Sequence, residues 1–223
     1  MGRINELNDF TRGQLDAALM KIGQDAGMGT AEGIRAFLRG ELSISSPPRS
    51  WREEDGVIYF SVTPDGADGE TWITLLEGNI FLVEYCAKEV LRSPSFKSTN
   101  GVTTEVAVLK GMLFEDQCRI TELIRAHAEA FRTPDKRKLE KPNAELACLI
   151  RRKFTDKEIE AMGLTCIVAM HEPINDSDGN PGLLSARRDG GGRWLNAYNG
   201  RSDCRWGRDH GFAFAVSQAR PTE

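Results

Sequence analysis

Three residue types are missing from residues 173–222, the stretch that ends one residue before the last residue of this chain. Residues 173–222 contain no Lys, no Glu and no Met, although the chain of 223 residues has 9 Lys, 19 Glu and 6 Met. At the average of the whole chain, a segment of this length holds about seven or eight such residues. Solvent-exposed loops accept Lys and Glu freely, so a loop structure alone does not explain their absence.

Closely spaced cysteine pairs are also missing. The chain has five cysteines, an odd number, without a Cys-x-x-Cys pair, which excludes the usual zinc sites and disulfide frameworks. They are Cys86, Cys118, Cys148, Cys166 and Cys204. The first four lie in apolar sequence and are expected to pack as small hydrophobic residues in a reducing compartment. Cys204 lies among polar residues and is expected to be exposed.

The chain has no apolar run that approaches the length of a membrane span and no excess of basic residues. The net charge is −4 and the pI is about 5.6, which disfavours nucleic-acid binding. Residues 1–10 are polar, which predicts no signal peptide and makes the cytoplasm the default location. A hydrophobic content of 40% with 28% charged residues is typical of a globular protein.

The first part of the sequence predicts a helical hairpin over residues 1–46. Thr11 begins a capping-box pattern before one helical repeat, and Thr30 can cap a second. The stretch 43–50 contains two prolines and reads as a break before a main domain over residues 51–223. A DNA-reading helix pair is disfavoured because Arg35 and Arg39 form its only basic cluster.

The main domain begins as a mixture of strands and helices. Strands are expected at residues 57–62, 103–109 and 166–170, and helices at 70–77, 84–91, 116–131 and 155–162. After residue 170, turn formers dominate and apolar pieces are short. The sequence therefore predicts an α+β fold with a small antiparallel sheet, flanking helices and a long, irregular, strand-poor C-terminal segment.

His171 and Glu172 are the first candidates for chemistry, as a general base or a metal ligand. No second histidine stands one helical turn away, as zinc proteases require. A histidine that fixes a turn through hydrogen bonds is the favoured interpretation. A catalytic pair of Cys204 and His210 is disfavoured because neither residue lies in a known catalytic motif.

Asp176, Asp178 and Asn180 alternate as the oxygen ligands of calcium loops do. An EF-hand needs Gly at the sixth position and Glu at the twelfth, where this chain has Pro181 and Arg187. Another kind of calcium loop stays open, although an Asx-turn cluster is favoured. No other metal or cofactor is indicated, and the three glycines at 190–192 predict a turn rather than a phosphate-binding loop.

The tail alternates apolar anchors with polar residues. The anchors are Trp194, Leu195, Trp206, Phe212 and Phe214. Residues 173–222 contain seven Arg and no Lys, and Tyr, Asn, Ser, Gly and Arg are the residues that binding surfaces use most. The predicted binding residues are Ser185, Arg187, Asn196, Tyr198, Asn199, Arg201, Asp203, Cys204, Gly207, Asp209 and His210.

Residues 183–218 resemble the variable region of the variable proteins of diversity-generating retroelements, which have a C-type lectin fold. The resemblance is clearest at 192–198 (Gly-Arg-Trp-Leu-Asn-Ala-Tyr) and at 206–216 (Trp-Gly-Arg-Asp-His-Gly-Phe-Ala-Phe-Ala-Val). In such proteins a fixed frame carries positions that are diversified at adenines, often in Asn codons. Changes at the first two bases of these codons cannot produce Lys, Glu, Gln, Met or Trp, and residues 196–205 contain none of these.

The resemblance implies a lectin-like domain over 51–223 with a variable region at about 183–218. It implies a receptor for a protein or cell-surface ligand rather than an enzyme. A C-type lectin fold also needs its first and last strands close together, which a pairing of 57–62 with 212–216 would supply. The alternatives are a lectin-fold oxidase or hydrolase that uses His171, Glu172 or Cys204, and an intracellular protein whose tail is only a loop.

Overall fold

The computed structural model describes residue 35 and residues 49–218. The chain divides into two compact units, residues 1–49 and residues 50–223. In the first unit, Arg35 is helical and exposed. The helical hairpin predicted for residues 1–46 otherwise lies outside the described residues, and the following concerns the second unit.

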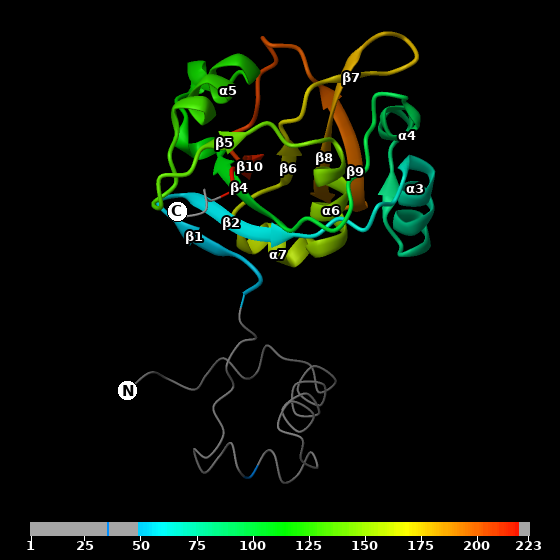
Figure 1. Ribbon diagram of the computed structural model, residues 1–223, viewed down its shortest axis with the longest axis horizontal. Coiled ribbons are helices and arrows are strands. Elements are labelled where there is room, and N and C mark those ends of the chain that lie inside the picture. Colours follow the sequence, from blue (N-terminus) through cyan, green and yellow to red (C-terminus); the bar gives the residue numbers. More distant parts are fainter. Residues whose placement is uncertain (1–34, 36–48, 219–223) are drawn as a thin grey trace, which may run out of the picture. The chain divides into compact units, whose positions relative to one another are not determined.

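The described part of the second unit is built around one ten-stranded sheet (Figure 1). The strands are β1 (Arg52–Glu54), β2 (Val57–Val62), β3 (Leu82–Val83), β4 (Thr104–Lys110), β5 (Leu139–Glu140), β6 (Cys166–Ala169), β7 (Ile174–Asn175), β8 (Pro181–Asp189), β9 (Gly192–Asn199) and β10 (His210–Val216). Their order is β1-β2-β4-β10-β6-β8-β9-β3, with β5 beside β10 and β7 beside β8. Neighbours are antiparallel except β10 with β6 and β3 with β9, which are parallel.

Five α-helices and two 3₁₀ turns are seen in the same residues. They are α3 (Gly69–Gly78), α4 (Tyr85–Arg92), η2 (Gly111–Leu113), η3 (Asp116–Cys118), α5 (Thr121–Ala130), α6 (Glu145–Lys153) and α7 (Asp156–Ala161). The capping box predicted at Thr155 is confirmed: its side chain accepts from Glu158 N, and the Glu158 carboxylate accepts from Thr155 N. Among the described helices, none is long and apolar enough to cross a membrane.

Side chains alternate across the sheet and form two hydrophobic cores. On one face, Ile58 and Val108 pack under α3, α4, α6 and α7. On the other face, Tyr59, Leu109 and Phe212 pack under α5, which lies apart from the other helices (Figure 1). The mixture of helices with a mostly antiparallel sheet confirms the predicted α+β class.

The prediction of a small sheet with an irregular, strand-poor tail was wrong. The tail contains β8, β9 and β10, and the first two are the longest strands in the described chain. Residues 190–191 join β8 to β9 in a two-residue turn, since Asp189 is paired with Gly192. Polar residues and Gly are interspersed in these strands. The sequence therefore does not show the clear alternation of apolar and polar residues that identifies a strand.

Two further predictions were wrong. Strands 57–62 and 212–216 do not pair with each other, because β4 lies between β2 and β10 and is hydrogen-bonded to both. The helix predicted for 116–131 is a 3₁₀ turn followed by α5, which begins only at Thr121. Ile120 adopts an extended conformation and forms a bridge with Arg205, so a contact distant in sequence interrupts the helix.

Candidate binding surface

The strand register brings the predicted site residues onto the α5 face of the sheet. His210, Cys166, Arg187 and Trp194 stand in one row across β10, β6, β8 and β9. Ser185 and Asn196 are opposite each other in the next row, and Leu183 and Tyr198 in the row after that. His210 and Cys166, which lie 44 positions apart in the chain, are therefore direct neighbours in the sheet.

Tyr198 covers the middle row. Its hydroxyl accepts a hydrogen bond from Arg187 Nη1 at 2.7 Å and also bonds the Cys166 side chain. Arg187 stands one row beyond Ser185 and Asn196, so the Arg187–Tyr198 pair spans the row that these two residues form. Burial raises the pKa of Tyr198, and burial raises the pKa of the Cys166 thiol to about 12. Both groups are therefore neutral at ordinary pH.

In the described part of the chain, four unpartnered polar atoms lie in the row of Ser185 and Asn196 and in the row of Trp194 and His210. Ser185 Oγ, Trp194 Nε1, Asn196 Oδ1 and His210 Nδ1 are buried and have no hydrogen-bond partner among the described residues. Buried polar atoms of this kind are rare, because each lost hydrogen bond to water destabilises the fold. Burial also lowers the pKa of His210, which keeps its ring neutral.

The loop from residue 200 to 209 is attached to the start of α5 through backbone atoms. Ser202 O accepts from Glu122 N at 2.9 Å, and Cys204 O accepts from Thr121 N at 3.1 Å. Trp206 N donates to Arg119 O at 2.9 Å. The first two bonds use free N–H groups at the start of α5, which otherwise lack partners.

Trp206 anchors the end of the loop in the core. It is 6% exposed, and its indole N–H donates to Thr121 Oγ1 at 3.0 Å. Its ring meets Tyr198 and Phe212 edge to face, with centroids 5.7 and 5.8 Å apart. The loop therefore has a fixed backbone and a fixed aromatic end.

Four side chains of the loop extend away from this framework. Arg201, Asp203, Arg205 and Arg208 are exposed, and none makes a side-chain hydrogen bond or ion pair with the residues that the structure describes. Arg205 and Arg208 were missed by the sequence argument. Arg205 ends the run that lacks Lys, Glu, Gln, Met and Trp, and that signal could have identified it.

The predicted binding residues differ widely in exposure. Asn199, Arg201, Asp203 and Asp209 are exposed. A second group is partly buried: Arg187, Asn196, Tyr198, Cys204, Gly207 and His210. Ser185 is completely buried, so its predicted place on the binding surface is wrong: the Arg187–Tyr198 pair spans its row.

The anchor residues are also divided. Trp206, Phe212 and Phe214 belong to the core under α5, whereas Leu195 belongs to the core on the opposite face. Trp194 is only partly buried and belongs to neither core. Its side chain shares the face of Asn196 and Tyr198, at the margin of the candidate surface.

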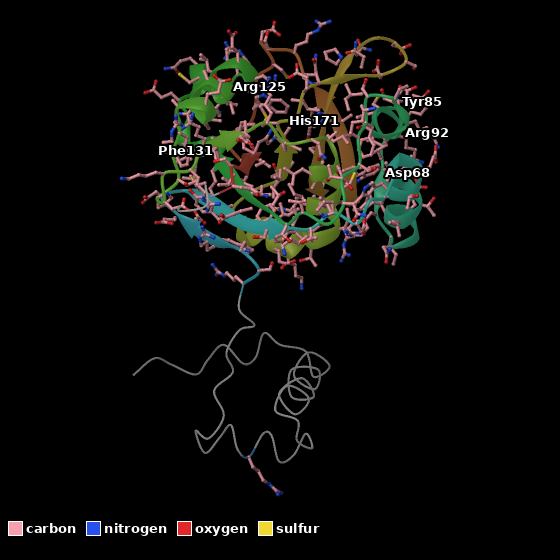
Figure 2. The ribbon with its side chains drawn as sticks, in the orientation of Figure 1. Asp68, Tyr85, Arg92, Arg125, Phe131 and His171 are labelled. Carbon is pink, nitrogen blue, oxygen red and sulfur yellow. The ribbon has the colours of Figure 1, made fainter. Side chains whose placement is uncertain are left out.

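His171 is a structural residue that fixes a turn. Its Nδ1 donates to Glu172 O at 2.6 Å, and its Nε2 accepts from Leu184 N at 3.0 Å. Arg125 of α5 donates to His171 O at 2.6 Å, and Figure 2 shows both residues. Burial lowers the pKa of His171 to about 4, so the ring is neutral, and each of its nitrogens makes one of these hydrogen bonds. Glu172 is exposed and pairs with Lys141 at 2.9 Å.

Cys204 is not activated as a nucleophile. Burial and the neighbouring Asp203 raise the pKa of its thiol, which disfavours the reactive thiolate. Its Sγ donates a weak hydrogen bond to Arg205 O at 3.9 Å.

Asp176 closes the turn between β7 and β8. Its Oδ1 accepts from Asp178 N at 3.0 Å and from Asn180 N at 2.8 Å, the pattern of an Asx turn. The described residues contain no group of three His, Cys, Asp or Glu side chains that could hold a metal ion.

No family model, curated protein or solved structure matches this chain. The function is therefore inferred from the geometry of the surface and from the composition of its residues.

Proposed function

We propose that this chain is a ligand-binding display protein whose receptor surface is formed by the exposed side of β9 and the loop of residues 200–209, called the display loop below. Its ligand is a protein or a cell-surface molecule. Diversification of positions within 183–218 and a C-type lectin-like organisation of the domain are parts of this proposal.

The attachment of the display loop carries the proposal. Its bonds to α5 and to Arg119 use the backbone carbonyls of Ser202 and Cys204, which every residue has, and the backbone N–H of Trp206, which every residue except proline has. The exposed side chains between those bonds have no structural partner in the described chain. Changing them alters what the surface presents without changing how the loop is held.

The distribution of residue types agrees with this division. Trp206 cannot arise from an Asn codon by changes at the first two bases, and it is the buried end of the loop. Asn199, Arg201, Asp203 and Arg205 can arise in this way, and all four are exposed. Within residues 200–209, the one residue that this route cannot produce is thus a buried one.

The sheet topology is compatible with a lectin-like organisation. β2 and β10, the first long strand and the last, both pair with β4. The ends of the domain are therefore brought together at one strand, although not by the direct pairing that the resemblance implies.

Binding rather than catalysis is favoured by the state of the candidate catalytic groups. His171 has both ring nitrogens in hydrogen bonds, and the Cys204 thiol is held in its protonated form. Neither group is available to transfer a proton or attack a substrate.

The DNA around the gene tests the proposal. We expect a reverse transcriptase gene nearby and a near-copy of the DNA that encodes residues 183–218. The two copies should differ only where the near-copy has adenine, and the differences should fall at exposed codons such as those of Arg201 and Asp203. Differences scattered over other bases, or the absence of both elements, would contradict diversification.

A further inference from the structure

A pocket lies on the other side of the sheet from the display loop. It holds about 450 Å³ and is bounded by the ends of β2, β4 and β10 and by α6. Ala215 of β10 and Leu149 of α6 line it, and Leu149 belongs to the core opposite the one that contains Trp206. The pocket is therefore separated from the display loop by the thickness of the sheet.

The walls of this pocket are mainly apolar. Val62, Leu146, Leu149 and Ala215 supply hydrocarbon surface, and Val102 lies at the pocket with 55% of its surface exposed. Pockets that bind small molecules have volumes of about 300–1,000 Å³ and combine apolar walls with a few polar groups. The size and lining fit a small molecule with an apolar body.

One wall is held by a buried carboxylate. Glu145 is 0% exposed, and its carboxylate accepts from Thr99 N and Thr99 Oγ1, each at 2.8 Å, and from Trp72 Nε1 at 3.2 Å. Thr99 lines the pocket, so these bonds fix its position. A pocket with a fixed wall loses little conformational entropy when a ligand enters.

The polar end of the pocket carries a positive charge. Lys141 is the one charged residue among the described lining residues. Its Nζ is 2.9 Å from Glu172 Oε2, but both side chains are more than half exposed. Exposed pairs of this kind contribute little to stability, so Lys141 can exchange its partner for a ligand carboxylate.

We propose that this pocket binds small amphipathic carboxylates, with the hydrocarbon body against Leu146 and Leu149 and the carboxylate at Lys141. The proposal does not depend on the display function, since the two surfaces lie on opposite faces of the sheet.

Sodium octanoate tests the proposal on the full chain, with amide chemical shifts as the measurement. Saturable shifts are expected at Asn100, Val102, Asn143 and Ala215, with a dissociation constant of about 1 mM or tighter. Octylammonium chloride should bind at least about tenfold more weakly, because its charge is repelled by Lys141. Equal binding of the two would overturn the assignment of the charged end.

Two variants with a matched control locate the site. Val102→Asp places a negative charge at the pocket and should weaken octanoate binding at least about tenfold, whereas Met112→Asp should not change it. Met112 is 56% exposed and does not line the pocket, so the two changes are alike in chemistry and exposure.

Ala215→Leu narrows the cavity and should also weaken binding. Because Val102 is exposed, the Val102→Asp variant keeps the test decisive if Ala215→Leu fails to fold. Shifts that stay at wild-type strength in Val102→Asp, or that are absent in the wild-type chain, would overturn the proposal.

Discussion

Replacing Trp206 by Ala tests whether the display loop depends on its buried end rather than on its exposed side chains. Trp206 is 6% exposed, contacts Tyr198 and Phe212, and donates its indole N–H to Thr121 Oγ1. Truncating a buried Trp to Ala destabilises a protein by about 3–5 kcal/mol. The lost hydrogen bond adds roughly 1 kcal/mol, because Thr121 is fully buried. The expected loss is about 4–6 kcal/mol.

The comparison is a variant with four exposed positions changed together: Arg201→Ser, Asp203→Ser, Arg205→Ser and Arg208→Ser. None of these side chains makes a hydrogen bond or an ion pair within the described residues. Surface changes of this kind usually alter stability by less than about 0.5 kcal/mol each. For four such changes we expect a total below about 2 kcal/mol.

Urea unfolding followed by circular dichroism measures both variants, with equal m-values as a check that the unfolded states are comparable. Trp194→Ala is the matched control, since Trp194 is only partly buried and should lose less stability than Trp206→Ala. A quadruple variant as unstable as Trp206→Ala would refute the separation of frame from display.

Three further predictions concern the supporting structure. His171 has a folded pKa of about 4, below its unfolded value of about 6.5, so its contribution to stability falls as pH drops from 6.5 to 4. We expect the unfolding free energy to fall by about 3 kcal/mol over this range. The His171→Gln variant should lack this loss when its unfolding is measured over the same range. Asp176→Ala removes the acceptor of two backbone N–H groups and should lower the unfolding free energy by about 1–2 kcal/mol in urea titrations, while calcium chloride leaves the melting temperature of the wild type unchanged. Arg151 is fully buried and donates to Arg187 O and Phe154 O. Arg151→Met should therefore lower the unfolding free energy by about 3 kcal/mol in the same assay. A change below about 1 kcal/mol would contradict the role of Arg151 in holding β8.

Elements with strong local signals were predictable from the sequence. β2, β4 and β6 are short apolar runs rich in β-branched residues, and α7 begins with a capping box. These signals depend on residues within a few positions of each other. Such elements form where the local pattern and the packed structure agree.

The arrangement around the candidate surface was not predictable in this way. β8 and β9 carry Arg, Asn and Gly on their outer positions, which weakens the apolar alternation that identifies strands. The burial of Ser185 depends on the place of β8 between β6 and β9, and the late start of α5 depends on the bridge between Ile120 and Arg205. Both are contacts between strands or segments that the sequence does not relate.

Because backbone hydrogen bonds hold the display loop, proline is excluded from some of its positions. Cys204 N donates to Arg201 O, and Trp206 N donates to Arg119 O, so both positions need an N–H group. Proline lacks that group, yet it is among the residues that an Asn codon reaches by changes at its first two bases. If position 204 is diversified as proposed, folded variants should carry there the residues that an Asn codon reaches, with proline depleted because the loop needs this N–H group.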